Sequence, residues 1–218
     1  MTNDEIWQFG WGWVGNSPNG DDNKLEKNVR VVVNTETGQI VSVAAGSLSQ
    51  GQVHHNFPDK ILLPGFVNCH SHAFQRGLRG KGEEGGGSFW TWRDGMYKLI
   101  SNLSDKQSEN PQSRLEQFKQ HCTRCFQEMR NCGITTVGEF HYFHHGSDQT
   151  NARHKYKHDE IILEAAKEAG IRMVLLNAFY GQGGIIDKNM SEAQERFKTQ
   201  SFDEWRTNFE RLQKVELH

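Results

Sequence analysis

The stretch that decides the fold is ILLPGFVNCHSHAFQRGLRG at residues 61–80. An apolar run turns at a Pro-Gly pair and leads to His70 and His72. Side chains at i and i+2 of an extended strand leave the same face, so both imidazoles can bind one divalent ion while Ser71 points away. That spacing alone is weak evidence for a metal. The polar residues after the apolar run strengthen it, since active sites of α/β barrels gather at the C-terminal ends of the strands.

From residue 61 onward, strand-like and helix-like segments alternate, which is typical of parallel βαβ units. We expect strands at residues 61–67, 134–140 and 171–179. We expect helices at residues 113–131, 159–169 and 192–215, the last with a break near Ser201. Gly133 and Gly170 follow the first two helices, as glycines commonly do. The pattern predicts an α/β fold.

The N-terminal part of the chain has a different pattern. Residues 29–46, VRVVVNTETGQIVSVAAG, contain two β-rich runs joined by a turn with Gly38. This predicts a β-hairpin in which glycine supplies a positive φ. We therefore expect one unit at residues 1–60 and a second at 61–218.

Composition excludes several classes of protein. The 218 residues have a formal net charge of −2 and a pI near 6.6. No basic stripe alternates with aromatic residues, so nothing indicates a nucleic-acid partner. Residues 1–15 lack the pattern of a signal peptide, and the apolar runs are too short to span a bilayer. These features predict a cytoplasmic protein with no membrane partner.

The four cysteines, Cys69, Cys122, Cys125 and Cys132, lack the spacing of a structural zinc site. Cys122 and Cys125 are one helical turn apart in an amphipathic segment. Buried thiols on a helix are favoured over a redox or zinc pair.

Three blocks of sequence carry a resemblance to a known family: HSHAFQRGLRG at 70–80, SFWTWRDGMY at 88–97 and GITTVGEFHYFHH at 133–145. The first block resembles the first strand of the amidohydrolase superfamily of metal-dependent hydrolases. All three together, in this order and spacing, are most similar to the N-formimino-L-glutamate deiminases. The resemblance extends from about residue 29 to about residue 184.

This resemblance implies the N-terminal part of a (β/α)8 TIM-like barrel preceded by a small β-sandwich segment. Residues 61–218 would form its first three βα units. A closed barrel needs roughly 250 residues, and about 158 remain from residue 61, so we expect the barrel to be incomplete in this chain. The superfamily's acid–base groups and further ligands, a His on strand five, a His on strand six and an Asp on strand eight, would lie beyond residue 218. No catalytic acid or base is therefore expected here.

The resemblance also implies a metal, a reaction and a substrate. His70 and His72 would bind Zn²⁺ or another divalent ion such as Fe²⁺, which lowers the pKa of water and so promotes hydrolysis. The reaction would be deimination of N-formimino-L-glutamate, an acidic amidine, to N-formyl-L-glutamate and ammonia in histidine catabolism. Gln75, Arg93 and Tyr142 match residues that contact substrate in the family, Arg93 by pairing with a carboxylate.

Each substrate residue also has a simpler interpretation. Gln75 could be a loop amide, Arg93 a surface arginine and Tyr142 a half-buried aromatic residue. Around Tyr142, Glu139, His141, His144 and His145 suggest a second metal site. Strand alternation places Glu139 and His141 on the face opposite Tyr142, so we favour supporting or solvent-exposed roles for these four. The glycine-rich residues 81–88 lack the pattern of a phosphate-binding loop and are expected to form a loop over the site.

Two rival hypotheses remain. One is another deaminase of the same superfamily acting on a heterocyclic base; Arg93 discriminates, because a dicarboxylate needs a cation whereas a flat ring prefers stacking. The other is an inactive, truncated fragment of such an enzyme, which the mass of the native protein would reveal. A homodimer is allowed for a full-length form.

Overall fold

The structure is a computed structural model that describes residues 3–14, 24–46, 52–81, 86–104, 111–146 and 155–215. The chain divides into two compact units, residues 1–65 and 66–218. The boundary expected after residue 60 falls inside a strand, His55–Leu62, and the observed division follows Gly65. The polypeptide is a mixed α/β chain.

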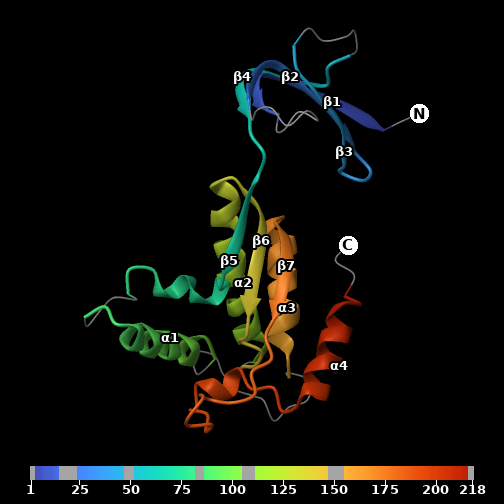
Figure 1. The fold of residues 1–218 in the computed structure, drawn as a ribbon. Coiled ribbons are helices and arrows are strands. Elements are labelled where there is room, and N and C mark those ends of the chain that lie inside the picture. The colour runs from blue at the N-terminus through green and yellow to red at the C-terminus, as the bar shows by residue number, and fades with distance from the viewer. Residues whose placement is uncertain are drawn as a thin grey trace. The chain divides into compact units, whose positions relative to one another are not determined.

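The first unit contains a four-stranded sheet with the order β3-β2-β1-β4 (Figure 1). Its strands are β1 (Asp4–Trp13), β2 (Leu25–Asn34), β3 (Ile40–Ala44) and β4 (His55–Leu62). The antiparallel pair β2 and β3 confirms the predicted hairpin. Gly38 has φ 67°, a conformation that glycine adopts without steric cost. The Asn34 side chain accepts a hydrogen bond from the Thr37 N–H at 2.9 Å and closes the turn.

The second unit contains a three-stranded parallel sheet with the order β5-β6-β7. The strands are β5 (Phe66–Ser71), β6 (Ile134–His141) and β7 (Arg172–Asn177). The strands predicted at 134–140 and 171–179 are confirmed, the second being shorter than expected. The parallel order brings the carboxyl ends of all three strands to one edge of the sheet.

The strand predicted at 61–67 is wrong. Residues 55–62 belong to β4 of the first unit, and β5 begins at Phe66, after Pro64 and Gly65. Proline lacks a backbone N–H and cannot donate to a sheet ladder. The apolar run therefore splits between two strands that belong to different sheets.

The helices of the second unit are α1 (Phe89–Ser104), α2 (Pro111–Asn131), α3 (Lys157–Ala169) and α4 (Phe202–Leu212), with short 3₁₀ helices η1 (Ala73–Leu78) and η2 (Gln194–Arg196). Two of them, α2 and α3, begin two residues before their predicted positions. The break near Ser201 is confirmed, since this residue caps α4 by accepting a hydrogen bond from the Glu204 N–H. The segment before the break forms η2 rather than an α-helix, and α1 was not predicted. Among the described helices, none is both long and apolar enough to cross a membrane.

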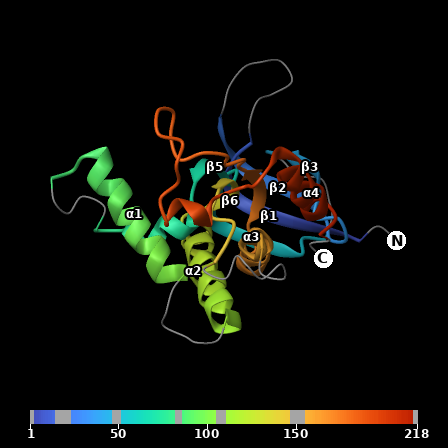
Figure 2. The same ribbon diagram turned by 90° about the horizontal axis from the view of Figure 1, so that it is seen from below.

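One face of the parallel sheet is covered and the other is open in this chain. Figures 1 and 2 show α2 and α3 on the same side of the strands. On β6, Val137 is fully buried against these helices, whereas Phe140 on the opposite face is 45% exposed. Val67, Val174 and Leu176 are exposed as well. The two faces therefore provide two different environments for polar side chains.

Candidate active site and a buried histidine network

His70 and His72 lie together at the carboxyl end of β5. Their ring centroids are 5.2 Å apart and the planes are nearly perpendicular. Nδ1 of His72 lies 2.8 Å from the carbonyl oxygen of Phe140. Because a carbonyl only accepts, Nδ1 carries the proton and Nε2 keeps its lone pair, which is the form in which histidine binds a metal. Two imidazoles on one zinc ion, with Zn–N distances of about 2.0–2.1 Å, have centroids about 5 Å apart, so this pair fits one ion.

An irregularity in β5, between Asn68 and Ser71, includes the first of these two histidines. Asn68 pairs with Val137 and Ser71 pairs with Glu139, so β5 contains one residue more than β6 between these points. Such a bulge re-aims side chains and is common beside active sites. The consecutive residues Cys69 and His70 are consequently both exposed, while Ser71 is buried. Simple alternation along the strand does not describe this segment.

Two of the predicted substrate residues contact each other. Nε2 of Gln75, on η1, donates to the hydroxyl oxygen of Tyr142 at 2.6 Å. The Tyr142 hydroxyl also lies 3.2 Å from the sulfur of Met96, and its ring is 5.5 Å from the ring of His72. Burial raises the pKa of Tyr142 well above its usual value, so the hydroxyl keeps its proton and can donate a hydrogen bond.

Arg93 lies on α1, away from these contacts. Its guanidinium is 4.6 Å from the ring centroid of Trp90 and 5.5 Å from that of Tyr97, with Asp94 at 3.8 Å. Together with Tyr97 and residues of the 183–194 loop it lines a hollow on the surface. Within the described part of the chain, Arg93 makes no hydrogen bond, ion pair or ring contact with the other predicted site residues. Its side chain is 36% exposed, so the guanidinium is accessible to a small anion.

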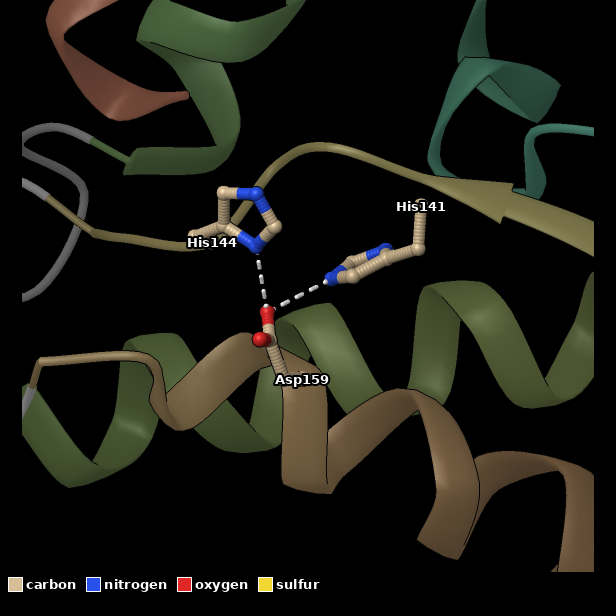
Figure 3. A group of neighbouring side chains, drawn as sticks. All are labelled: His141, His144 and Asp159. Carbon is tan, nitrogen blue, oxygen red and sulfur yellow. Dashed lines mark hydrogen bonds and ion pairs between the residues drawn. The ribbon is translucent and has the colours of Figure 1, made fainter. Parts of the chain in front are cut away.

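A second group of polar residues lies on the helix-covered side of β6. His141 from the end of β6, His144 from the loop that follows, and Asp159 from α3 are all completely buried (Figure 3). Nε2 of His141 and Nδ1 of His144 lie 3.1 and 2.8 Å from the same oxygen, Oδ1 of Asp159. Their ligand atoms all lie within 4.8 Å of one another, so the group could hold a metal ion.

The surrounding contacts favour a hydrogen-bond network instead. Nδ2 atoms of Asn177 and Asn208 donate to Oδ2 of Asp159 at 2.9 and 2.7 Å. Nε2 of His144 lies 2.9 Å from the carbonyl oxygen of Ala178. Donors already fill both carboxylate oxygens, and the network connects β6, α3, β7 and α4. Nδ1 of His141 and Oδ1 of Asn177 have no hydrogen-bond partner among the described residues, but the carboxylate at the centre is fully bonded, and such a network rigidifies the fold around it.

The network carries charge. Burial by itself would raise the pKa of Asp159, but the nearby charge of His144 and hydrogen bonds from both histidines outweigh it, so the pKa lies well below the usual value. Both ring nitrogens of His144 face acceptors, and only an imidazolium can donate to both. The geometry is therefore that of a buried ion pair with additional amide donors.

Two further histidines beside the network are buried as neutral rings. Burial lowers the pKa of His145 to about 4 and that of His158 to about 3. Nδ1 of His145 accepts a hydrogen bond from the Tyr156 N–H, and its Nε2 lies 2.9 Å from the carbonyl oxygen of Lys198. Both nitrogens thus have partners in the neutral form. These rings fill the space between the end of β6 and the start of α3.

The solvent-exposed role considered for Glu139, His141, His144 and His145 is wrong, because all four are at most 1% exposed. The predicted alternation within β6 is confirmed: Glu139 and His141 share the buried face and Phe140 the open one. Burial raises the pKa of Glu139, and hydrogen bonds from neighbouring residues of β5 and η1 oppose this.

Sequence patterns did not reveal Asp159, Asn177 or Asn208. Asp159 contacts the histidines, and Asn177 and Asn208 contact Asp159, from elements up to 67 residues beyond His141. Each of the three is an ordinary residue in its own segment. The local signal that could have indicated them is a buried acid in the first turn of an amphipathic helix that follows a histidine-rich loop.

Two smaller predictions have different outcomes. The prediction of buried thiols on α2 is confirmed for Cys122, which is fully buried, whereas Cys125 is only partly buried; burial raises the pKa of Cys125 to about 12. Half of the loop predicted at 81–88, residues 82–85, lies outside the described residues.

Comparison with known proteins decides the family. The model of the amidohydrolase family matches residues 61–217. This chain belongs to the amidohydrolase family. The resemblance expected from the three sequence blocks is thereby confirmed.

Two known proteins extend the comparison. Formimidoylglutamate deiminase of Pseudomonas aeruginosa is 39% identical over 139 residues, which are 62% of this amidohydrolase chain and 28% of that protein. The chain therefore spans little more than a quarter of the curated relative it matches. A mutant of atrazine chlorohydrolase TrzN from Arthrobacter aurescens TC1, complexed with zinc and atraton, has a similar fold, with TM-score 0.68 and 16% identity. That match covers 97% of this chain and 43% of the other.

Proposed function

We propose that this chain supplies part of the active site of a metal-dependent deiminase that converts N-formimino-L-glutamate and water to N-formyl-L-glutamate and ammonia. The observation that carries the proposal is the contact set around His72. Its ring lies beside Tyr142, which shares a hydrogen bond with Gln75. Residues proposed to bind the ion and the substrate thus converge at the carboxyl ends of β5 and β6, where barrels of this class place their chemistry.

In this proposal His70 and His72 bind Zn²⁺ or a similar divalent ion such as Fe²⁺. The ion would lower the pKa of water and supply hydroxide for attack on the amidine carbon. The protein orients this ligand through the hydrogen bond from Nδ1 of His72 to the Phe140 carbonyl oxygen. This bond directs Nε2 of His72 away from the sheet. The neutral hydroxyl of Tyr142 and the amide of Gln75 offer donors for the substrate.

Arg93 would pair with a carboxylate of the substrate. The planar guanidinium can donate two parallel hydrogen bonds to a carboxylate, and Trp90 supports it from one side. Because Arg93 lies at a hollow distinct from the contacts of Tyr142, it would bind the distant, acidic end of the substrate rather than the amidine.

The same proposal extends to architecture and context. The first unit would belong to a small β-sandwich and the second unit to the first three βα units of a (β/α)8 barrel, with the division after Gly65 rather than after residue 60. Later strands would then supply the catalytic acid–base groups, and this chain alone would be inactive. The proposed setting is cytoplasmic histidine catabolism, with a homodimer as an arrangement to test. Similarity to a deiminase over 139 residues and a parallel sheet with one open apolar face support this.

A substrate comparison tests the function. In the full-length protein that contains this chain, ammonia release from N-formimino-L-glutamate should be faster than from guanine or cytosine. Faster turnover of a nucleobase would favour the alternative, a deaminase of the same family acting on a heterocyclic base.

Arg93→Ala provides the sharper test. A charge-assisted hydrogen bond contributes about 1.5–3 kcal/mol, so KM should rise about 10- to 100-fold. Arg206→Ala is a matched control, because Arg206 also lies over an aromatic ring, that of Phe202 at 5.8 Å, but on α4. An unchanged KM in Arg93→Ala would remove this arginine from the site.

A further inference from the structure

A buried carboxylate holds the peptide group that follows His72. Oε1 of Glu139 accepts a hydrogen bond from the backbone N–H of Ala73 at 2.6 Å, and both residues are completely buried. Ala73 is the first residue of η1, where a backbone N–H has no partner within the helix. Glu139 thus supplies the partner that the turn itself lacks.

The residue on the other side of His72 lies against the same carboxylate. Ser71 pairs with Glu139 in the register of β5 and β6 and is buried. The next residue of β6, Phe140, accepts the hydrogen bond of the His72 ring through its carbonyl. Two consecutive residues of β6 therefore support His72. Glu139 contacts the backbone on both sides of it, and Phe140 contacts its ring.

The bulge in β5 explains why such support is needed. It interrupts the regular pairing of β5 with β6 between Asn68 and Ser71, at His70 and just before His72, so the sheet ladder alone does not determine the path of this segment. The Glu139 side chain accepts a hydrogen bond from the backbone N–H of Ala73. It thereby gives this segment a defined path without occupying the open face of the sheet.

We propose that Glu139 is a positioning residue that keeps the His70 and His72 rings in their ion-binding arrangement. This inference rests on the metal site proposed above. Glu139 is on the opposite face of β6 from Phe140 and acts through the backbone of Ala73. Without this acceptor the turn after His72 relaxes, and the lone pairs of the two rings no longer converge on one point.

The competing interpretation is that Glu139 only stabilises the fold. In that case, replacing Glu139 changes the free energy of unfolding of the metal-free chain but leaves the zinc affinity of the folded chain unaltered. A positioning role changes zinc affinity, since partners that orient metal ligands typically contribute 10- to 100-fold to it.

The test measures zinc affinity of the 218-residue chain by competition with a chromophoric chelator, alongside thermal unfolding without metal. Glu139→Ala should weaken zinc binding about 10- to 100-fold. Glu139→Gln keeps an acceptor oxygen of the same reach and should recover most of the affinity. Glu128→Ala is the matched control: it removes a carboxylate that binds Arg76 of the same η1 segment without contacting the peptide beside His72, and should change affinity less than twofold.

His70→Ala separates the two proposals. If it leaves zinc affinity unchanged, the proposed metal site is refuted and this inference with it. If it weakens zinc binding while Glu139→Ala does not, the site stands and the positioning role is overturned. Should Glu139→Ala fail to fold, Glu139→Leu decides, because it fills the same buried space without an acceptor for the Ala73 N–H. Weaker zinc binding by this variant supports the positioning role, and wild-type zinc affinity overturns it.

Discussion

Replacing Asp159 with Asn should destabilise the second unit strongly. The carboxylate is completely buried and accepts from four donors, on His141, His144, Asn177 and Asn208. An amide has one accepting oxygen and one NH₂ group, so whichever way it is oriented, the NH₂ faces two donors. Two charge-assisted hydrogen bonds are lost, each contributing about 1.5–3 kcal/mol.

Relaxation reduces this cost. Nδ1 of His141 makes no hydrogen bond to a described residue, so His141 can move its proton there and turn a bare nitrogen toward the new NH₂ group. We therefore expect the lower part of the range, about 3 kcal/mol, consistent with the roughly 3–5 kcal/mol measured on breaking buried ion pairs.

Urea unfolding at pH 7, followed by circular dichroism of the helices, measures this change. The described helices all lie in the second unit, so the signal reports the unit that contains Asp159. With a slope of about 1–3 kcal/mol per molar urea, the midpoint should fall by between about 1 and 3 M. Asp187→Asn, at an exposed carboxylate that binds only a nearby N–H in the same loop, should stay within about 0.5 kcal/mol. A loss below about 1 kcal/mol for Asp159→Asn would refute the account of the network.

Three further predictions follow from the site and the buried rings. Replacing both His70 and His72 with Ala should abolish zinc binding by the chain, as measured by metal analysis; retained zinc that Asp159→Asn then removes would instead place an ion in the buried network. Burial holds the pKa of His145 at about 4, against about 6.5 when unfolded, so the stability that the neutral ring contributes is present above pH 6.5 and is lost as pH falls. From pH 7 to pH 5 the free energy of unfolding should fall by about 2 kcal/mol on account of this ring. His145→Gln should show a correspondingly flatter pH dependence in urea titrations. Tyr142→Phe should lower kcat/KM for N-formimino-L-glutamate about 2- to 10-fold in the full-length protein, the scale of one neutral hydrogen bond; an unchanged value would exclude the hydroxyl from substrate binding.

Local patterns account for the parts of this chain that depend on neighbouring residues. The hairpin with Gly38 and the strand at residues 134–140 were predictable, because side-chain alternation and turn chemistry act over a few residues. The spacing of His70 and His72 likewise indicated a pair that can share an ion. The apolar run at residues 61–67 was misassigned because periodicity does not show which sheet a strand joins.

Tertiary structure decided the features that depend on distant residues. Four donors meet Asp159 from β6, β7, α4 and a loop, an arrangement no local pattern encodes. The bulge before His72 arises from pairing with a strand some 65 residues away, and the support from Glu139 exists only once that pairing forms. Side-chain type and spacing are set within a segment, whereas burial and hydrogen-bond partners are set by how segments pack. The histidines could therefore be recognised from the chain itself, but which of them face the open side of the sheet and which are buried behind it could not.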